Sequence, residues 1–460
     1  MLQDLLAPFK AKITGHTELR VQRNAHRGVG LLKGNIVNNS SSESSGLSAR
    51  VYQGGFWGFA SGAEYDGKAV EAVLGAAERN AKFLTSRLGS PKPAFAVLPG
   101  GKLNTKRTEV TDSEAREFLE FAKEIDGYIA GKYPELTSRS VGVNCDYIEK
   151  LFITSDGADG YSLIPRAFIY CSMTAQTDDG LPVDLYEPFG GAGFFPDQFS
   201  DPKLLFSGID GLYEKLMKKR EGVFPEAGTC DVILDCKLAG ILAHEAIGHT
   251  VEADLVLGGS VAGPYLGKTV ASEIVNMVDF AHTALGEETP QPIYVDDEGT
   301  AAKDAVLIKD GVLVGYMHNR ESAAHFGHEP VGNARAYAFS DEPLIRMRNT
   351  AILPGTSKLD DMVASIDDGY YFVSWNNGQA DLTSEFMFGV VEGYEIKKGK
   401  IARALRDTTI SGVAFDVLKT VTMLSDEMDW TSNGMCGKKQ PMPTGMGGPA
   451  VKCRVNIGGR

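Results

Sequence analysis

Hydrophobic and polar residues alternate with a period of two over much of the first 60 residues, which is the pattern of antiparallel strands with one buried face. The alternation predicts strands at residues 18–22, 29–37 and 48–60. A polar stretch, residues 38–46, separates the last two and is rich in Ser and Asn. It is too short for a disordered domain, and we expect either a long hairpin connection or an edge strand.

Apolar residues at helical spacing predict a first helix from a cap at Asp66 to about Leu88. Its apolar stripe consists of Val70, Val73, Leu74, Ala77, Ala81 and Leu84. A second helix is predicted to begin at Thr111, where Glu114 completes a capping box, and to end near Gly131.

Residues 138–188 read as short strands, with hairpin signals at Asp156-Gly157 and Asp179-Gly180. A third helix is expected over about residues 202–220, and a Gly- and Pro-containing boundary follows at residues 222–228.

After this boundary the pattern predicts a strand at residues 231–234, then a helix in an apolar run from Leu238 to Ile247. The remainder is β-rich, with a last helix over about residues 410–424 before a Gly-rich tail. We therefore predict an α+β fold with two domains. Residues 1–222 form an N-terminal α/β domain with antiparallel strands and helices, and residues 223–460 form a β-rich C-terminal domain.

Composition narrows the classes of function. The chain has 460 residues, of which 43% are hydrophobic and 23% charged, as in a soluble globular protein. Its 46 basic and 60 acidic residues give a net charge of −14, so direct nucleic-acid binding is not expected. The sequence shows no signal-peptide pattern and no apolar run near the ~18 residues that span a bilayer. The six scattered Cys indicate reduced thiols in a cytoplasmic protein.

The segment His244-Glu245-Ala-Ile-Gly-His249 lies at the end of the apolar run. Helical zinc hydrolases carry two His ligands one turn apart, with a Glu beside the first as general base. Here the second His is at i+5, about 140° around an ideal helix from the first. We therefore predict that the helix widens into a π-type turn or ends before His249, with Gly248 absorbing the change.

The competing interpretation is two ordinary histidines and a solvated carboxylate. The combination of a His-Glu pair, an apolar helix and a second His across a Gly favours a metal site. A catalytic zinc site needs a third protein ligand and one open position. Spacing alone leaves four candidates for this ligand, which are Cys436, Cys453, Cys230 and His318.

Several segments together resemble the TldD/PmbA family, known as modulators of DNA gyrase, whose TldD branch is a zinc peptidase with a His-Glu-x-x-x-His motif. In family order these are His244-Glu245-Ala-Ile-Gly-His249, Asp296-Asp297-Glu298-Gly299-Thr300, Arg346-Met-Arg-Asn349-Thr350, Gly378-Gln379-Ala-Asp381 and Met435-Cys436-Gly437-Lys438. The resemblance spans nearly the whole chain and is most specific in its second half. The PmbA (TldE) branch lacks the motif, so the similarity is to the catalytic branch. The chain departs from the family at Gly447-Gly448-Pro449, where Gly-Gln-Pro is usual.

The resemblance implies that zinc is held by His244, His249 and Cys436, and that Glu245 is the general base. Glu252 and Asp254 could accept hydrogen bonds from the ligand His rings, although a solvated turn is an alternative. The acidic cluster Asp296-Asp297-Glu298 could bind a cation, and we favour a structural turn. Gly190-Gly191-Ala192-Gly193 lacks the Lys-Ser/Thr of a phosphate loop, and no cofactor other than Zn²⁺ is expected. The spacing of His318, His325 and His328 does not support ligand roles.

The expected function is zinc-dependent hydrolysis of unfolded or extended peptides, bound partly by strand addition. A zinc hydrolase of small amides or esters is one alternative, and a non-enzymatic modulator or partner protein with structural zinc is another. An open fourth metal position favours an enzyme and a fourth protein ligand favours the structural role. The resemblance also implies a homodimer, or a heterodimer with a PmbA/TldE-type subunit.

Overall fold

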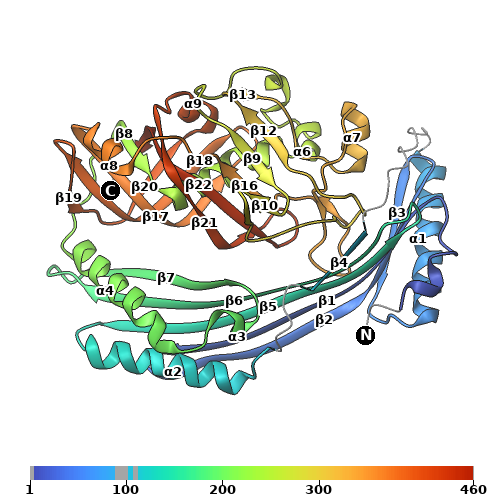
Figure 1. Cartoon of the computed structure of the whole chain (residues 1–460), viewed down its shortest axis with the longest axis horizontal. Helices are drawn as coiled ribbons and strands as arrows, with labels where there is room; N and C mark the ends of the chain where they lie inside the picture. The colour runs from blue at the N-terminus through green and yellow to red at the C-terminus, as the bar shows by residue number, and fades with distance from the viewer. Residues whose placement is uncertain (1–4, 89–101, 107–111, 459–460) are drawn as a thin grey trace.

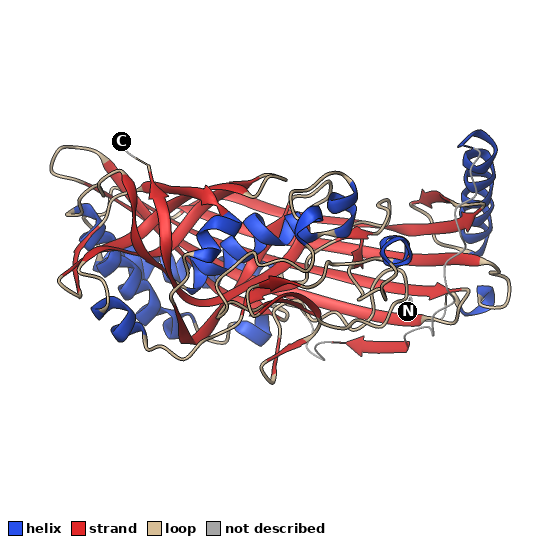
Figure 2. Ribbon diagram, turned by 90° about the horizontal axis from the view of Figure 1, so that it is seen from above, coloured by secondary structure: helices blue, strands red, loops and turns tan. Residues whose placement is uncertain are grey.

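The chain folds into two β layers that lie one above the other (Figure 1). The structure, a computed structural model, describes residues 5–88, 102–106 and 112–458. A long, curved N-terminal sheet lies beneath the C-terminal part, and the view from above shows the two overlapping (Figure 2). The architecture is α+β, as predicted.

The N-terminal sheet has the order β3-β2-β1-β5-β6-β4, with β7 paired to β6, and every pairing is antiparallel except β4 with β6. Its strands are β1 His16–Leu32, β2 Asn35–Gln53, β3 Phe56–Gly62, β4 Lys102–Lys106, β5 Ser138–Thr154, β6 Asp159–Gln176 and β7 Pro182–Ala192. The hairpin turns at residues 156–157 and 179–180 are confirmed, but the strands they join are long and not short.

The Ser-rich stretch belongs to β2. Residues 38–46 pair with β1 on one side, whereas β3 pairs with β2 only from Leu47 onward. The edge-strand alternative is therefore confirmed and the hairpin connection is wrong. Ser and Asn are poor strand formers, so it is the ladder with β1 that holds this segment extended.

Helices cover the outer face and one end of this sheet (Figure 1). They are α1 Gly67–Leu88, α2 Ala115–Lys132, α3 Phe195–Gln198 and α4 Phe206–Arg220, with a 3₁₀ turn at Pro202–Leu205. Asp66 caps α1 by accepting a 2.8 Å hydrogen bond from the amide of Ala69, as predicted. The second helix begins later than expected: its N-cap, Glu114, makes no side-chain capping bond. The proposed capping partner, Thr111, lies outside the described residues.

The C-terminal sheet is formed, within the described ranges, by eleven strands in the order β13-β12-β9-β16-β22-β20-β18-β17-β8, with β19 on β18 and β21 on β22. They are β8 Gly228–Leu234, β9 Met277–Phe280, β12 Ala305–Lys309, β13 Val312–Leu313, β16 Asn349–Ile352, β17 Asp368–Ala380, β18 Glu385–Lys397, β19 Lys400–Ala404, β20 Thr408–Val413, β21 Met423–Cys436 and β22 Met442–Ile457. The short strands outside it are β10 Thr283–Ala284, β11 Glu287–Glu288, β14 Ala334–Arg335 and β15 Leu344–Ile345. Because β8 also pairs with β22, the larger strands close around a common core.

The helix predicted over residues 410–424 is wrong. The expected helix over residues 410–424 is instead β20, the six-residue helix α9 Ala414–Lys419 and the start of β21. The Gly-rich tail is strand β22, which pairs with β8, β16, β20 and β21. Its glycines permit close packing: a Cβ on Gly448 would lie 3.0 Å from Cβ of Ala239, and one on Gly447 would lie 2.6 Å from the Trp430 ring.

The predicted helix after β8 is present as α5 Cys236–Ile241, and it continues into a π-helical turn, Leu242–Gly248, and a 3₁₀ turn, His249–Val251. Its apolar residues are buried on every side by the surrounding strands. The other C-terminal helices are the short α6 Ala253–Leu257, α7 Arg320–Phe326 and α8 Leu359–Ala364. None of the described helices has the length and apolar character needed to cross a membrane.

Candidate metal centre

The helix that carries both motif histidines widens where the i+5 spacing requires it. The stretch Leu242–Gly248 is π-helical, and the amide of His249 donates to the carbonyl of His244, five residues earlier. The two imidazole rings consequently lie on one side of the helix, with centroids 5.3 Å apart. The π-type turn predicted from the spacing is confirmed.

The prediction that Gly248 absorbs the change in helical geometry is wrong. Its φ of −51° and ψ of −50° are ordinary right-handed helical values, so the glycine does not absorb the change by leaving helical geometry. A Cβ at this position would instead lie 2.2 Å from Sδ of Met347 and 3.1 Å from the carbonyl oxygen of Ala243. Gly248 is needed because the side chain of Met347 occupies the space beside the π turn.

Cys436, at the end of β21, meets the two histidines. One ligand atom from each of His244, His249 and Cys436 lies within 4.8 Å of the others, and Sγ is 3.4 Å from Nε2 of His249. In the part of the chain that the structure describes, this is the only such group of three or more His, Cys, Asp or Glu. The other candidates for third ligand, Cys453, Cys230 and His318, do not join it.

Without a metal ion, Cys436 and His249 form a thiolate–imidazolium pair, and a bound metal would replace the proton on His249. Burial raises the pKa of Cys436, but hydrogen bonds and charge interactions with His244 and His249 outweigh it and lower that pKa to about 3. Burial lowers the pKa of His249, whereas Cys436 and Glu252 raise it to about 10. The sulfur is therefore a thiolate, the form that binds metal.

The donor set fits zinc. One thiolate and two imidazoles are zinc ligands of the kind found in catalytic sites. His244 is 1% exposed, and its buried Nδ1 has no hydrogen-bond partner among the described residues. Buried polar atoms are nearly always paired, so this ring is incomplete without a further partner.

Glu245 lies beside the two rings on the more open side of the group. Its side chain is 24% exposed, and its carboxylate oxygens are 3.6 Å from Nε2 of His249 and 4.0 Å from Nε2 of His244. It is outside the three-residue ligand group, yet close enough to act on a water molecule held there.

The two other carboxylates proposed near the histidines have different partners. Glu252 is fully buried, and its Oε2 lies 2.7 Å from Nδ1 of His249. Asp254 does not contact a histidine ring; it accepts a 2.8 Å hydrogen bond from Nζ of Lys438.

A buried arginine holds the loop that follows Cys436. Arg346 is 0% exposed and donates to three backbone carbonyls, those of Cys436 at 2.8 Å, Lys438 at 2.9 Å and Gln440 at 2.6 Å. No role for Arg346 follows from the sequence pattern. The one feature of the sequence that pointed to Arg346 is that it lies in a segment that resembles the family and contains no proposed ligand.

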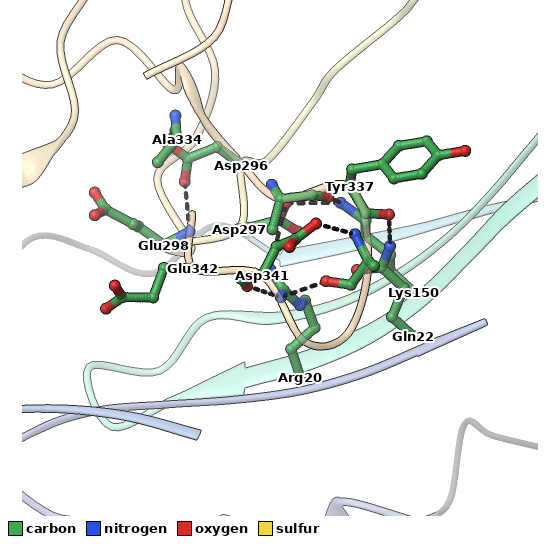
Figure 3. A network of polar contacts seen from close by, with 12 residues as sticks. Arg20, Gln22, Lys150, Asp296, Asp297, Glu298, Ala334, Tyr337, Asp341 and Glu342 are labelled. Atoms are coloured by element: carbon green, nitrogen blue, oxygen red, sulfur yellow. Dashed lines mark hydrogen bonds and ion pairs between the residues drawn. The ribbon is translucent and has the colours of Figure 1, made fainter. Parts of the chain in front are cut away.

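The acidic cluster at residues 296–298 is structural, as favoured, and not a cation site. Asp297 accepts from Nζ of Lys150 at 2.6 Å and from the amide of Ala336 at 2.7 Å (Figure 3). Asp296 accepts from the backbone amides of Glu298, Thr300 and Ala334. Glu298 pairs with Arg50 of β2 at 2.5 Å. Asp297 and Glu298 therefore join the C-terminal part to the N-terminal sheet, whereas Asp296 holds the backbone around the cluster.

Two cavities lie along β21, between it and the N-terminal sheet. Their volumes are about 430 and 360 Å³. Phe168, Asn433 and Met435 line both, and Met435 directly precedes Cys436. The edge of β21 away from β22 is bridged to Ser357 at Ser425, whereas residues 429–435, which line the larger cavity, have no other strand beside them in the described ranges. Both cavities therefore extend to the residue before Cys436, although none of the three possible ligands lines them.

Sequence models of one family match three stretches of the chain. They are described as PmbA/TldA metallopeptidase domain 1, central domain and C-terminal domain, over residues 17–81, 108–209 and 227–459. A metalloprotease of Methanocaldococcus jannaschii is 30% identical over 458 residues, which cover 97% of each chain. A zinc metalloprotease TldD homolog of Saccharolobus solfataricus is 28% identical over 424 residues, which cover 90% of each.

Solved structures show the same fold. A putative modulator of a DNA gyrase from Thermotoga maritima aligns with a TM-score of 0.76 at 20% identity, covering 99% of this chain and 98% of the other. TldE from Thermococcus kodakarensis aligns with a TM-score of 0.73 at 18% identity over the whole of both chains.

Proposed function

Since the chain belongs to the PmbA/TldD metallopeptidase family, we propose that it is a zinc-dependent peptidase in which His244, His249 and Cys436 hold the metal. The observation that carries the proposal is the convergence of these three side chains, with Glu245 beside them. The names of curated relatives, which include a zinc metalloprotease, agree with it.

Zinc bound there would lower the pKa of a water molecule to about 7 and polarise a substrate carbonyl. Glu245 would accept the proton of the attacking water and deliver it to the leaving amine. Its exposure suits this role, because the general base must reach both water and substrate, whereas a ligand need only reach the metal.

The substrates we propose are unfolded or extended peptides. Residues 429–435 of β21 have an edge with no second strand beside it in the described ranges, and this edge offers backbone donors and acceptors to a chain in extended form. Such pairing depends little on sequence. The cavities of about 430 and 360 Å³ beside that edge provide room for side chains. A folded protein presents few segments that can enter between two sheets.

Two other functions could use the same metal centre. A hydrolase of small amides or esters would use the same centre, but it would not need the long strand edge. A structural zinc in a non-enzymatic modulator would be closed by a fourth protein ligand. In the described residues the group of possible ligands has three members, the number found in catalytic zinc sites, and this supports the enzyme.

The test combines metal analysis with peptidase assays. We expect one zinc per chain in the wild type and little in Cys436→Ser. Extended peptides should be cleaved by the wild type, alone or mixed with a PmbA/TldE-type subunit. Full zinc occupancy in Cys436→Ser would exclude this site. A wild-type protein that binds zinc but hydrolyses no peptide, either alone or with the PmbA/TldE-type subunit, would favour the structural alternative. The dimeric state and the cytoplasmic location stay predictions from the sequence.

A further inference from the structure

Glu252, which touches a proposed ligand, also touches a lysine on the other side. The carboxylate is fully buried, with Oε2 2.7 Å from Nδ1 of His249 and Oε1 3.2 Å from Nζ of Lys438. The Lys438 contact is close, but Oε1 forms no hydrogen bond in it, so the ammonium acts on this oxygen chiefly as a charge. Glu252 therefore bridges a histidine and a lysine.

Lys438 is itself held in place from three directions. Its side chain is 8% exposed, and Nζ lies 2.8 Å from the Asp254 carboxylate and 3.0 Å from the carbonyl oxygen of Ile345, to which it donates. The ammonium donates hydrogen bonds to Asp254 and Ile345, and Oε1 of Glu252 lies on its third side as an ion-pair partner. The end of this side chain consequently has one fixed position.

The backbone of Lys438 is fixed as well. Its carbonyl accepts one of the hydrogen bonds from Arg346, which also binds the carbonyl of Cys436. Lys438 thus belongs to the same rigid loop as the proposed thiolate ligand, while its ammonium reaches the carboxylate behind the proposed imidazole ligand.

The orientation of a histidine ring at a metal is set by the partner of its second nitrogen. With Oε2 of Glu252 on Nδ1, Nε2 of His249 points to Cys436, 3.4 Å from Sγ. A carboxylate free to rotate would not hold the ring in this way.

We propose that Lys438 is a positioning residue, which fixes the Glu252 carboxylate against Nδ1 of His249 and so directs Nε2 of that ring toward the metal. The inference rests on the proposed function only in taking His249 and Cys436 as ligands; it does not depend on what the enzyme cleaves.

A merely structural role for Lys438 would be to anchor its loop through Asp254. The chain offers matched variants that separate the two roles. Lys438→Met removes the charge and keeps the apolar stem, with Lys438→Gln as a second neutral variant. Lys438→Arg restores the charge. Asp254→Asn weakens the anchor and leaves the contact with Glu252.

The experiment measures zinc affinity by chelator competition. In the zinc-loaded proteins, NMR of ¹⁵N-labelled imidazoles, which number eight in the chain, shows which nitrogen of His249 carries the proton. We expect Lys438→Met and Lys438→Gln to bind zinc about 10–100-fold more weakly, the range found for lost outer partners of metal ligands. His249 should show a mixture of tautomers in both. Lys438→Arg should recover most of the affinity and a single Nδ1–H signal, and Asp254→Asn should change affinity by less than about threefold.

Wild-type affinity with a single Nδ1–H tautomer in a folded Lys438→Met or Lys438→Gln protein would overturn the inference and leave the zinc site standing. An equal loss in Asp254→Asn would assign Lys438 to loop anchoring instead. A wild-type protein that binds no zinc would remove both this inference and the proposed function.

Discussion

Replacement of Gly248 by Ala tests why a glycine precedes the second motif histidine. The added Cβ would lie 2.2 Å from Sδ of Met347, a side chain that is 0% exposed. Overpacking a buried site costs about 1–3 kcal/mol. Alanine is favoured over glycine in a helix by roughly 0.5–1 kcal/mol. The net loss of unfolding free energy should therefore be between about 0 and 2.5 kcal/mol.

The contact with Met347 makes a double-mutant cycle decisive. Met347→Ala alone should cost about 2–5 kcal/mol, because it leaves a cavity. In that background Gly248→Ala no longer meets the sulfur, and it should be neutral or stabilising by up to about 1 kcal/mol. The coupling energy between the two positions is then on the order of 1–3 kcal/mol.

The assay is urea unfolding of the four zinc-free proteins, with zinc affinity measured in parallel. Gly248→Ala should also weaken zinc binding by about 10-fold in the wild-type background, because His249 is displaced with the π turn. An equal effect of Gly248→Ala on stability with and without Met347 would refute the steric explanation. A gain in stability in the wild-type background would refute it as well.

Three further predictions concern the general base and the junction between the two parts of the chain. Glu245→Gln should keep zinc and lose at least about 10²-fold in hydrolysis, measured against the exposed control Glu287→Gln; retained activity with full zinc would remove Glu245 as the base. Lys150→Met should cost about 3–5 kcal/mol, because it leaves the buried Asp297 carboxylate without its 2.6 Å partner. The exposed pair of Lys303 with Glu329 is the control, and Lys303→Met should change stability by less than about 1 kcal/mol. Burial and Glu298 raise the pKa of Asp296 to about 8, so its stabilising contribution is complete below its ordinary pKa of 3.8 and is lost as the pH rises through 8. The side chain in Asp296→Asn stays neutral at every pH. The unfolding free energy of this variant minus that of the wild type should therefore grow between pH 5 and 8. A constant difference would contradict the raised pKa.

The sequence was sufficient to predict those elements that are stabilised by residues within the element itself. Asp66 and the apolar stripe of α1 predicted that helix because a cap and a 3.6-residue period are both encoded within it. The i+5 spacing of His244 and His249 predicted the π turn for the same reason. Neither prediction required knowledge of a distant segment.

The features that could not be predicted depend on contacts between residues far apart in the sequence. The glycines of β22 look like a loop, but they are present because α5 and Trp430 approach the strand closely. The alternation in β1 predicts one buried face, and Leu19 and Val21 do pack against α1. The opposite face is also buried, because Arg20 and Gln22 donate to backbone carbonyls of residues 337–341. Polar side chains satisfied by a distant loop leave no local pattern. For the same reason spacing alone could not select Cys436 among four candidates.

The position of Cys436 sets when the centre can exist during synthesis. Cys436 follows His249 by 187 residues, and the strand that pairs with its own, β22, runs to Ile457. Chains emerge from the ribosome in order, and earlier segments fold first. The N-terminal sheet and the histidine-bearing helix are therefore made long before the thiolate that joins them. Until residues 436–457 have emerged and β22 has entered its sheet, the nascent chain lacks the third member of the group formed by His244, His249 and Cys436.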